Sequence, residues 1–309
     1  MTAVRETDVI VAGEVYADLI LSGFDAWPQL GQEVFAKEYR REIGGGTAIT
    51  ACGLATLGSR TSALAVLGSE DGQWLVQRLA SYGVDTSRLQ FEADEPTGFS
   101  LVAAMGHDRT FLTYPGANRT FDRALRETVA TGQLARHVHL AYAPRLDDAA
   151  SLLRKIRSHG CTISLDTGWH AEWLPDARAM EILQYVDIFL PNEMEANRLT
   201  GKTDAAAILE AFQGAGVKCV ALKLGPKGSA LLWRGSTTFA PALTVTPVDT
   251  TGAGDCFNAG FLHAWLSSDT PVDWLRAANI CGALSTESFG GIEGFPSRER
   301  FRQEMDKRG

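Results

Sequence analysis

Short apolar runs alternate along the chain with longer stretches in which apolar residues recur every three or four positions. The short runs are rich in Val, Ile, Leu and Ala and predict buried strands, whereas the periodic stretches predict amphipathic helices. The expected strands are 9–12, 62–67, 137–140, 162–166, 187–190 and 219–224. The expected helices are 47–57, 72–82, 147–158, 194–199 and 205–213. This alternation predicts an α/β fold, in which helices cover both faces of a mostly parallel central sheet.

Two further stretches, 33–41 and 97–114, have strand character without an intervening helix. In the second stretch, residues 105–109 separate two strand-like runs and are typical of a hairpin turn. We expect a small β-lid built from about residues 14–20, 32–43 and 96–116. An open edge of such a sheet invites pairing, which predicts a homodimer through the lid. No stretch is typical of a long linker, so residues 1–309 are expected to form a single domain.

Composition limits the possible partners and compartments. The chain of 309 residues is 45% hydrophobic and 21% charged, which is typical of a globular protein with a large core. Its formal net charge of −8 and the lack of a basic run argue against nucleic acid as a partner. The sequence has neither a secretory signal nor a membrane-length apolar run, so no membrane association is expected. Its five cysteines are widely spaced, which favours a reducing compartment, and we expect the cytoplasm.

The most informative motif is Asp-Thr-Thr-Gly-Ala-Gly-Asp, which ends at Asp255 and precedes an apolar run typical of a helix. The small residues Gly252, Ala253 and Gly254 permit a tight turn and leave room for an anion. A helix that starts at Asp255 would present free N–H groups to a phosphate, and the carboxylate could accept a hydroxyl proton. These groups together favour phosphoryl transfer to an alcohol, although Asp255 could instead simply cap the helix.

This motif resembles the C-terminal motif of the ribokinase (PfkB) family of sugar and nucleoside kinases, and other motifs follow the family's order from Val9 to Pro296. The resemblance implies a ribokinase-like three-layer α/β/α domain that phosphorylates a hydroxyl of a small sugar or sugar acid with ATP. Asp255 would be the catalytic base, and the amides of Gly252, Ala253 and Gly254 would hold the transferred group. A nucleoside kinase of the same family, or a catalytically silent ligand-sensing protein on the same fold, remains an alternative.

Three segments are similar to the family's substrate-binding motifs. They are a glycine run that opens the first expected helix, a carboxylate after the first strand, and the Gly-Ala-Asn stretch that leaves the lid. Ile49 stands where the family usually has Asn, and Asp166 matches the start of the family's Asp-Pro-Asn motif. The substrate-binding residues that the resemblance implies are Asp18, Gly44, Gly45, Thr47 and Asn118.

Other motifs imply a nucleotide and two kinds of metal ion. Asn192 and Glu195 match the family's Asn-x-x-Glu motif, which implies Mg²⁺ held through water molecules next to the ATP phosphates. The residues implied to bind the nucleotide are Lys223, Gly225, Gly228 and Asn279. A K⁺ ion is implied at Asp249, Thr251 and Gly291. His137 and His139 lie two apart on an expected strand, and we interpret them as core residues, not metal ligands.

Overall fold

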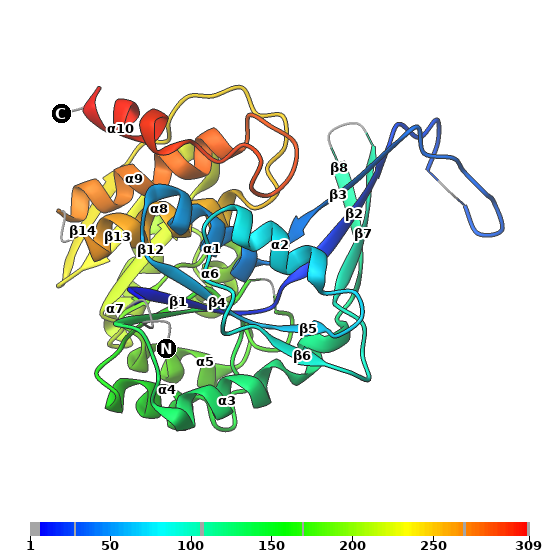
Figure 1. The fold of residues 1–309 in the computed structure, drawn as a ribbon. Coiled ribbons are helices and arrows are strands. Elements are labelled where there is room, and N and C mark those ends of the chain that lie inside the picture. Colours follow the sequence, from blue (N-terminus) through cyan, green and yellow to red (C-terminus); the bar gives the residue numbers. More distant parts are fainter. Residues whose placement is uncertain (1–6, 28, 106–107, 169, 268–269, 308–309) are drawn as a thin grey trace.

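The computed structural model describes residues 7–27, 29–105, 108–168, 170–267 and 270–307 (Figure 1). Within these ranges, eight strands form one sheet in the order β14-β13-β12-β11-β10-β9-β1-β4. The strands from β12 to β4 in this order are parallel, and β13 and β14 are antiparallel. Their bounds are β1 (Val9–Gly13), β4 (Thr61–Leu64), β9 (His137–Ala141), β10 (Thr162–Leu165), β11 (Ile188–Phe189), β12 (Cys219–Lys223), β13 (Ser229–Trp233) and β14 (Ser236–Ala240).

Helices cover both faces of this sheet, as Figure 1 shows. Strand β1 illustrates why, because its alternate side chains point to opposite faces. Val9 and Val11 join the core beneath α1 (Gly46–Leu57), α2 (Gln73–Ser81), α8 (Ala253–Leu266), α9 (Pro271–Ser285) and α10 (Arg298–Asp306). Ile10 and Ala12 join the core beneath α3 (Phe121–Thr131), α4 (Ala149–Ser158), α5 (Ala177–Ile182), α6 (Glu193–Thr200) and α7 (Ala205–Gly214). The predicted fold class is thereby confirmed.

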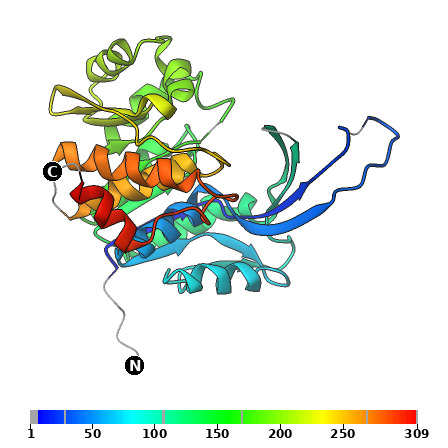
Figure 2. The same ribbon diagram turned by 90° about the horizontal axis from the view of Figure 1, so that it is seen from above.

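A second sheet, in the order β3-β2-β7-β8, projects away from the main one (Figure 2). We call it the projecting sheet. Its strands are β2 (Tyr16–Ser22), β3 (Glu38–Gly44), β7 (Phe99–Met105) and β8 (Asp108–Tyr114). Gly106 and His107, at the turn expected between β7 and β8, lie outside the described residues. Two short strands, β5 (Val66–Gly68) and β6 (Gln90–Glu92), pair separately, and three short 3₁₀ turns are η1 (Gly116–Thr120), η2 (Leu183–Tyr185) and η3 (Gly225–Lys227).

Some predicted boundaries were wrong. The strand expected at 62–67 is divided between β4 and β5, which belong to different sheets, because an apolar run does not reveal a bend within it. The strand expected to begin near residue 33 begins at Glu38. Helix α8 begins at Ala253 instead of Asp255, because Gly252 adopts the turn that starts it.

The parallel strands bring the segments that follow them to one edge of the main sheet. The segments that follow β1, β9, β10, β11 and β12 all leave from their carboxyl ends, where ligands of such sheets usually bind. The start of α8 is tied to this edge by side chains described below. Within the described residues, no helix has both the length and the apolarity needed to span a bilayer.

The contact between α8 and α9 depends on a glycine. A Cβ on Gly260 would lie 2.5 Å from the backbone oxygen of Ala277, whereas a Cβ on Gly214, at the end of α7, would meet nothing within 4 Å. We expect Gly260→Ala to lower the free energy of unfolding by about 1–3 kcal/mol, because the two helices must separate. Gly214→Ala is the matched control and should leave it unchanged or raise it by about 0.5 kcal/mol. Urea unfolding measures both, and equal stability of the two variants would contradict the close approach of α8 and α9.

Candidate active site

The first turn of α8 offers unpaired amides. Gly252, just before the helix, has φ 68°, a left-handed conformation that favours glycine. The N–H of Ala253 donates to the oxygen of Thr250 at 3.3 Å. Among the described residues, no acceptor meets the N–H groups of Gly254 and Asp255. These two amides are therefore available to an anion.

Asp255 is the third residue of α8 and not its cap, so the alternative interpretation of Asp255 as a capping residue is wrong. Its carboxylate lines a cavity of about 530 Å³, which we call the Asp255 cavity. A Cβ on Gly46 would lie 2.9 Å from Asp255 Oδ1, so the glycine leaves space beside the carboxylate. Burial, and secondarily repulsion from Asp166, raise the pKa of Asp255 to about 7, while Lys223 opposes the shift. Asp255 can therefore act as a base near neutral pH.

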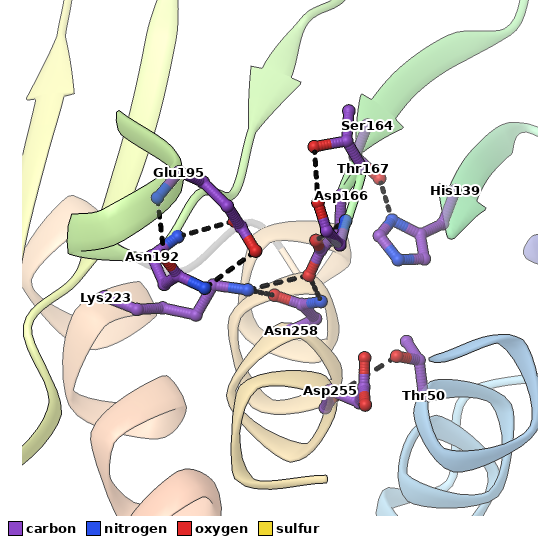
Figure 3. A network of polar contacts seen from close by, with 11 residues as sticks. Thr50, His139, Ser164, Asp166, Thr167, Asn192, Glu195, Lys223, Asp255 and Asn258 are labelled. Atoms are coloured by element: carbon purple, nitrogen blue, oxygen red, sulfur yellow. Dashed lines mark hydrogen bonds and ion pairs between the residues drawn. The ribbon is translucent and has the colours of Figure 1, made fainter. Parts of the chain in front are cut away.

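A buried ion pair joins three elements next to Asp255 (Figure 3). Lys223 Nζ, at the end of β12, donates to Asp166 Oδ2 at 2.7 Å and to Asn258 Oδ1 at 3.2 Å. Asn258 Nδ2, on α8, donates to Asp166 Oδ2 at 2.5 Å. Burial raises the pKa of Asp166, but Lys223 and these hydrogen bonds hold it below its usual range. The carboxylate therefore stays ionised and fixes α8 to the ends of β10 and β12.

Asn192 and Glu195 form a closed pair at the start of α6. Glu195 accepts hydrogen bonds from the backbone N–H of Asn192 at 2.9 Å and from its Nδ2 at 2.7 Å. Asn192 Oδ1 accepts from the N–H of Glu195 at 2.8 Å. Burial first, and repulsion from Asp166 second, raise the pKa of Glu195 to about 7. The pair is thus a capping box in which the ionised form of Glu195 is disfavoured.

The carboxylate oxygens at this edge of the sheet suit a Mg²⁺ ion bound through water molecules. Asp166, Glu195 and Asp255 bring three carboxylates near Lys223, which pairs directly with Asp166 and acts on the other two through its charge. Within the part of the chain that the structure describes, no group of three His, Cys, Asp or Glu side chains is arranged to ligate a metal ion directly. Mg²⁺ retains much of its water, so the oxygens at this edge suit an ion bound through water and phosphate oxygens.

Most of the residues that line the Asp255 cavity have polar side chains. The residues that line it together with Asp255 include Glu14, Tyr16, Asn118, Arg119, Asp122, Tyr142, Arg145, Asp166 and His170. Asn118 is among the expected substrate residues, but its side chain also bonds both ways to the backbone of Val15, at 3.2 and 2.9 Å. Among the described groups, no hydrogen-bond or ion-pair partner meets the guanidinium of Arg145.

The other expected substrate residues lie outside the lining of this cavity. Asp18 lines a cavity of about 280 Å³ that also contains Asp249, which we call the Asp249 cavity. A Cβ on Gly44 would overlap the Asp18 carboxylate, so Gly44 lies directly beside it. Burial raises the pKa of Asp18 to about 7, against a hydrogen bond with Ser100. Gly45 precedes α1 with φ 88°, and Thr47 is fully buried, without a partner for its hydroxyl among the described residues.

The expected nucleotide residues are divided in the same way. Lys223 and Gly225 line a cavity of about 570 Å³, the Lys223 cavity, together with Asn192, Glu193, Met194, Asn197, Thr203, Leu224, Pro226 and Lys227. Gly228, with φ 101°, packs against the backbone of Ala240. Asn279 donates to the backbone oxygens of Ala240 and Pro241, at 3.3 and 3.1 Å. Gly228 and Asn279 therefore support the segment after β14.

The residues expected to bind K⁺ already have other partners. Asp249 accepts hydrogen bonds from the N–H groups of Thr251 and Gly290, at 2.7 and 3.0 Å, and forms an ion pair with Arg109. Burial raises the pKa of Asp249, but these hydrogen bonds hold it below its usual range. The oxygen of Gly291 accepts from the thiol of Cys256 at 3.3 Å. This donor set does not fit a further cation.

His137 and His139 are core residues, as expected. Both are fully buried on β9, and both bond to the hydroxyl of Ser164 on β10, at 2.8 and 2.7 Å. Burial lowers the pKa of His137 to about 3 and that of His139 to about 4, so both stay neutral.

Several residues of the site were not found from sequence. Asn258 was hidden in an apolar run, although it follows Asp255 by three positions and so shares its helix face. Tyr142 and Arg145 follow β9, and the rule that ligands bind beyond strand ends could have identified them. Glu14 and Tyr16 follow β1 and lie in the same segment as Asp18, the residue that matches the family motif.

Comparisons with known proteins agree with this geometry. The model of the pfkB family carbohydrate kinases matches residues 6–298. A 2-dehydro-3-deoxygluconokinase of Bacillus subtilis is 29% identical over 85% of this chain and 86% of its own length. An ATP-dependent ribose-1-phosphate kinase of Halopiger xanaduensis is 30% identical over 90% of this chain and 91% of its own.

Among solved structures, the ribokinase of Arabidopsis thaliana complexed with ribose and ATP has a TM-score of 0.83 and 26% identity. The similarity covers 97% of this chain and 99% of that one. The family match, the fold and the edge chemistry lead to one conclusion: the chain belongs to the pfkB family of carbohydrate kinases and is an ATP-dependent kinase.

Proposed function

We propose that the chain transfers the terminal phosphoryl group of ATP to a hydroxyl of a small sugar acid or sugar bound in the Asp255 cavity. One observation carries this proposal: a carboxylate with a pKa near 7 lines that cavity in the same helical turn as two unpaired amides. Asp255 would accept the hydroxyl proton, and the amides of Gly254 and Asp255 would stabilise the charge on the transferred group. Gly252 and Ala253 shape the turn that exposes these amides.

The polar lining of the Asp255 cavity supports a polyhydroxylated substrate. Glu14, Asp122 and Asn118 supply oxygen atoms to the lining. Arg145 supplies a guanidinium that makes no hydrogen bond in the described chain, although its charge favours the ionised form of Asp122. A guanidinium pairs well with a carboxylate, so a sugar acid is the first choice. The similarity to a 2-dehydro-3-deoxygluconokinase supports the same choice.

We propose that ATP occupies the Lys223 cavity, with Lys223 and Gly225 beside its phosphates. Lys223 lines this cavity and contacts Asp166, which lines the Asp255 cavity, so its ammonium lies between the two. Asn192 and Glu195 would hold Mg²⁺ through water, and the ion would supply positive charge to neutralise the phosphates. Asp18, Gly44, Gly45 and Thr47 would shape the wall beside the substrate, and Gly228 and Asn279 would support the nucleotide side.

Two specific observations keep a nucleoside as the second candidate substrate. Tyr16, Phe121 and Tyr142 also line the Asp255 cavity, and the rings of Phe121 and Tyr142 are 4.9 Å apart. Aromatic rings of this kind can stack on a base. The third possibility, a silent ligand-sensing protein, would bind ATP and a ligand without turnover.

We further propose that residues 1–309 act as one kinase domain and that the projecting sheet is both its lid and a dimer contact. The five free cysteines suit a reducing compartment, and we propose that the enzyme is cytoplasmic. Tyr39, Phe111 and Leu112 of this sheet are exposed apolar side chains, which a second copy could cover. We expect a homodimer, and we expect Leu112→Asp to weaken it about tenfold or more, because a charge would enter the contact. Analytical ultracentrifugation measures the dissociation constant, and a monomeric wild-type protein would refute the dimer.

The main test measures ADP release from Mg-ATP with a panel of sugar acids, sugars and nucleosides. We expect one class to stimulate release, and we expect Asp255→Asn to reduce turnover by about 10²–10⁴-fold, because the base is lost. Nucleotide affinity should stay nearly unchanged.

A stability control shows that the variant is folded. Because burial raises the folded-state pKa of Asp255, the stability that its protonated form contributes is lost as the pH rises toward 7. Asp255→Asn should therefore melt no lower than wild type at pH 8. Near-wild-type turnover by a folded Asp255→Asn would refute the assignment, and ATP binding without any turnover would favour the silent protein.

The pH dependence offers a second test. Protonated Asp255 cannot accept a proton, so kcat/KM should fall about tenfold per pH unit below about pH 7 and level off above it. Lys223 lowers the pKa of Asp255, so Lys223→Met should move this limb to higher pH. Lys202→Met, which removes an exposed charge, is the control and should leave the limb unchanged. Identical limbs in all three folded proteins would show that Asp255 is not the titrating base.

A further inference from the structure

One ion pair connects the projecting sheet to the turn that starts α8. Arg109 lies on β8, and its guanidinium contacts both the carboxylate of Asp249 and the hydroxyl of Thr251. The Asp249 side chain is 6% exposed and that of Arg109 is 23% exposed, so water screens the pair only partly. Thr251 directly precedes Gly252, whose conformation starts α8. The contact therefore reaches the beginning of the anion-binding turn.

Both oxygens of Asp249 accept a backbone hydrogen bond at this position. Oδ1 accepts from the N–H of Thr251 at 2.7 Å, and Oδ2 accepts from the N–H of Gly290 at 3.0 Å. The carboxylate thus holds the turn against the 290 loop, and Arg109 provides its counter-charge. Nearby, the oxygen of Gly291 faces the thiol of Cys256.

From these contacts we infer that Arg109 takes the position of the monovalent cation implied at Asp249, Thr251 and Gly291, and that it locks the projecting sheet onto the turn that precedes Asp255. A guanidinium carries the same single positive charge as K⁺, and a second cation beside it would be repelled. Unlike a free ion, this charge is attached to the projecting sheet. The projecting sheet therefore helps to hold the turn that precedes Asp255.

The Asp249 cavity is lined by further charged residues, which could attract a cation independently of Asp249. Asp18, Glu38 and Glu42 face the same cavity, as does Arg40, which lies over the ring of Phe289. The cavity thus has more carboxylates than guanidinium groups, and a cation could be attracted to it for that reason alone. The experiment must distinguish a cation bound beside Arg109 from a position that Arg109 fills.

The first measurement is thermal unfolding in K⁺ and in tetramethylammonium at equal ionic strength. We expect the wild-type melting temperature to be the same in both salts, and Arg109→Ala to be stabilised by K⁺ alone, because only the variant has an open position. This measurement needs no substrate, so it stands even if the proposed phosphoryl transfer fails. A K⁺-specific stabilisation of the wild-type protein would overturn the inference.

The second measurement is kinetic and rests on the proposed function. We expect Arg109→Ala to lower kcat about tenfold or more in tetramethylammonium, since the turn is misplaced, and K⁺ to restore part of it. Arg109→Lys, which retains the charge but not the two-point contact, should fall between the two. Lys37→Ala is the control, because it removes one positive charge near the projecting sheet, where Lys37 pairs with Asp25, without touching Asp249. If Arg109→Ala matched Lys37→Ala in kcat, KM and salt response, Arg109 would have no positioning role.

Discussion

The buried ion pair between Asp166 and Lys223 is the constraint on which the rest of the site depends. Asp166 follows β10 and Lys223 ends β12, so the pair spans β11 between them, and Asn258 extends it to α8. Loss of one partner from a buried pair leaves an uncompensated charge, at a cost of about 3–5 kcal/mol. The sheet edge and α8 are therefore held in one arrangement, and the short distances of the site follow from it.

The same pair sets the charge of the site. Lys223 is shared by Asp166, Glu195 and Asp255, and one ammonium does not balance three carboxylates. Asp166 forms the direct hydrogen bonds with Lys223 and stays ionised. Burial and repulsion from the Asp166 carboxylate raise the pKa of both Glu195 and Asp255 to about 7. In the proposed reaction, Mg²⁺ beside these carboxylates would offset part of their negative charge and so would favour ionised Asp255. The excess of carboxylates suits the divalent cation, whereas the negative phosphates of ATP would be met by Lys223 and the unpaired amides at the start of α8.

Sequence reasoning was most successful where one local pattern determines the structure. The alternation of strands and helices, and the motif that ends at Asp255, each depend on neighbouring residues and were readable. Asn258 and Arg109 were not, because their importance comes from partners 92 and 140 positions away (258 − 166 and 249 − 109). Asp18 shows the opposite difficulty. It matches a family motif, but it lines the Asp249 cavity, while Glu14 and Tyr16 of the same segment line the Asp255 cavity.

Ile49 is an apolar residue at a position where the family usually has Asn. In this chain, Ile49 Cδ1 lies 2.9 Å from the Cβ position of Gly252 and 2.5 Å from that of Gly291. The side chain is 2% exposed and packs beneath the turn that precedes α8, so it cannot hold a hydroxyl. It instead fills the space between the two glycines and makes any larger residue at either position unfavourable. In the proposed reaction, substrate hydroxyls would instead be bound by residues that line the Asp255 cavity, among which Glu14, Asp122 and Arg145 are polar.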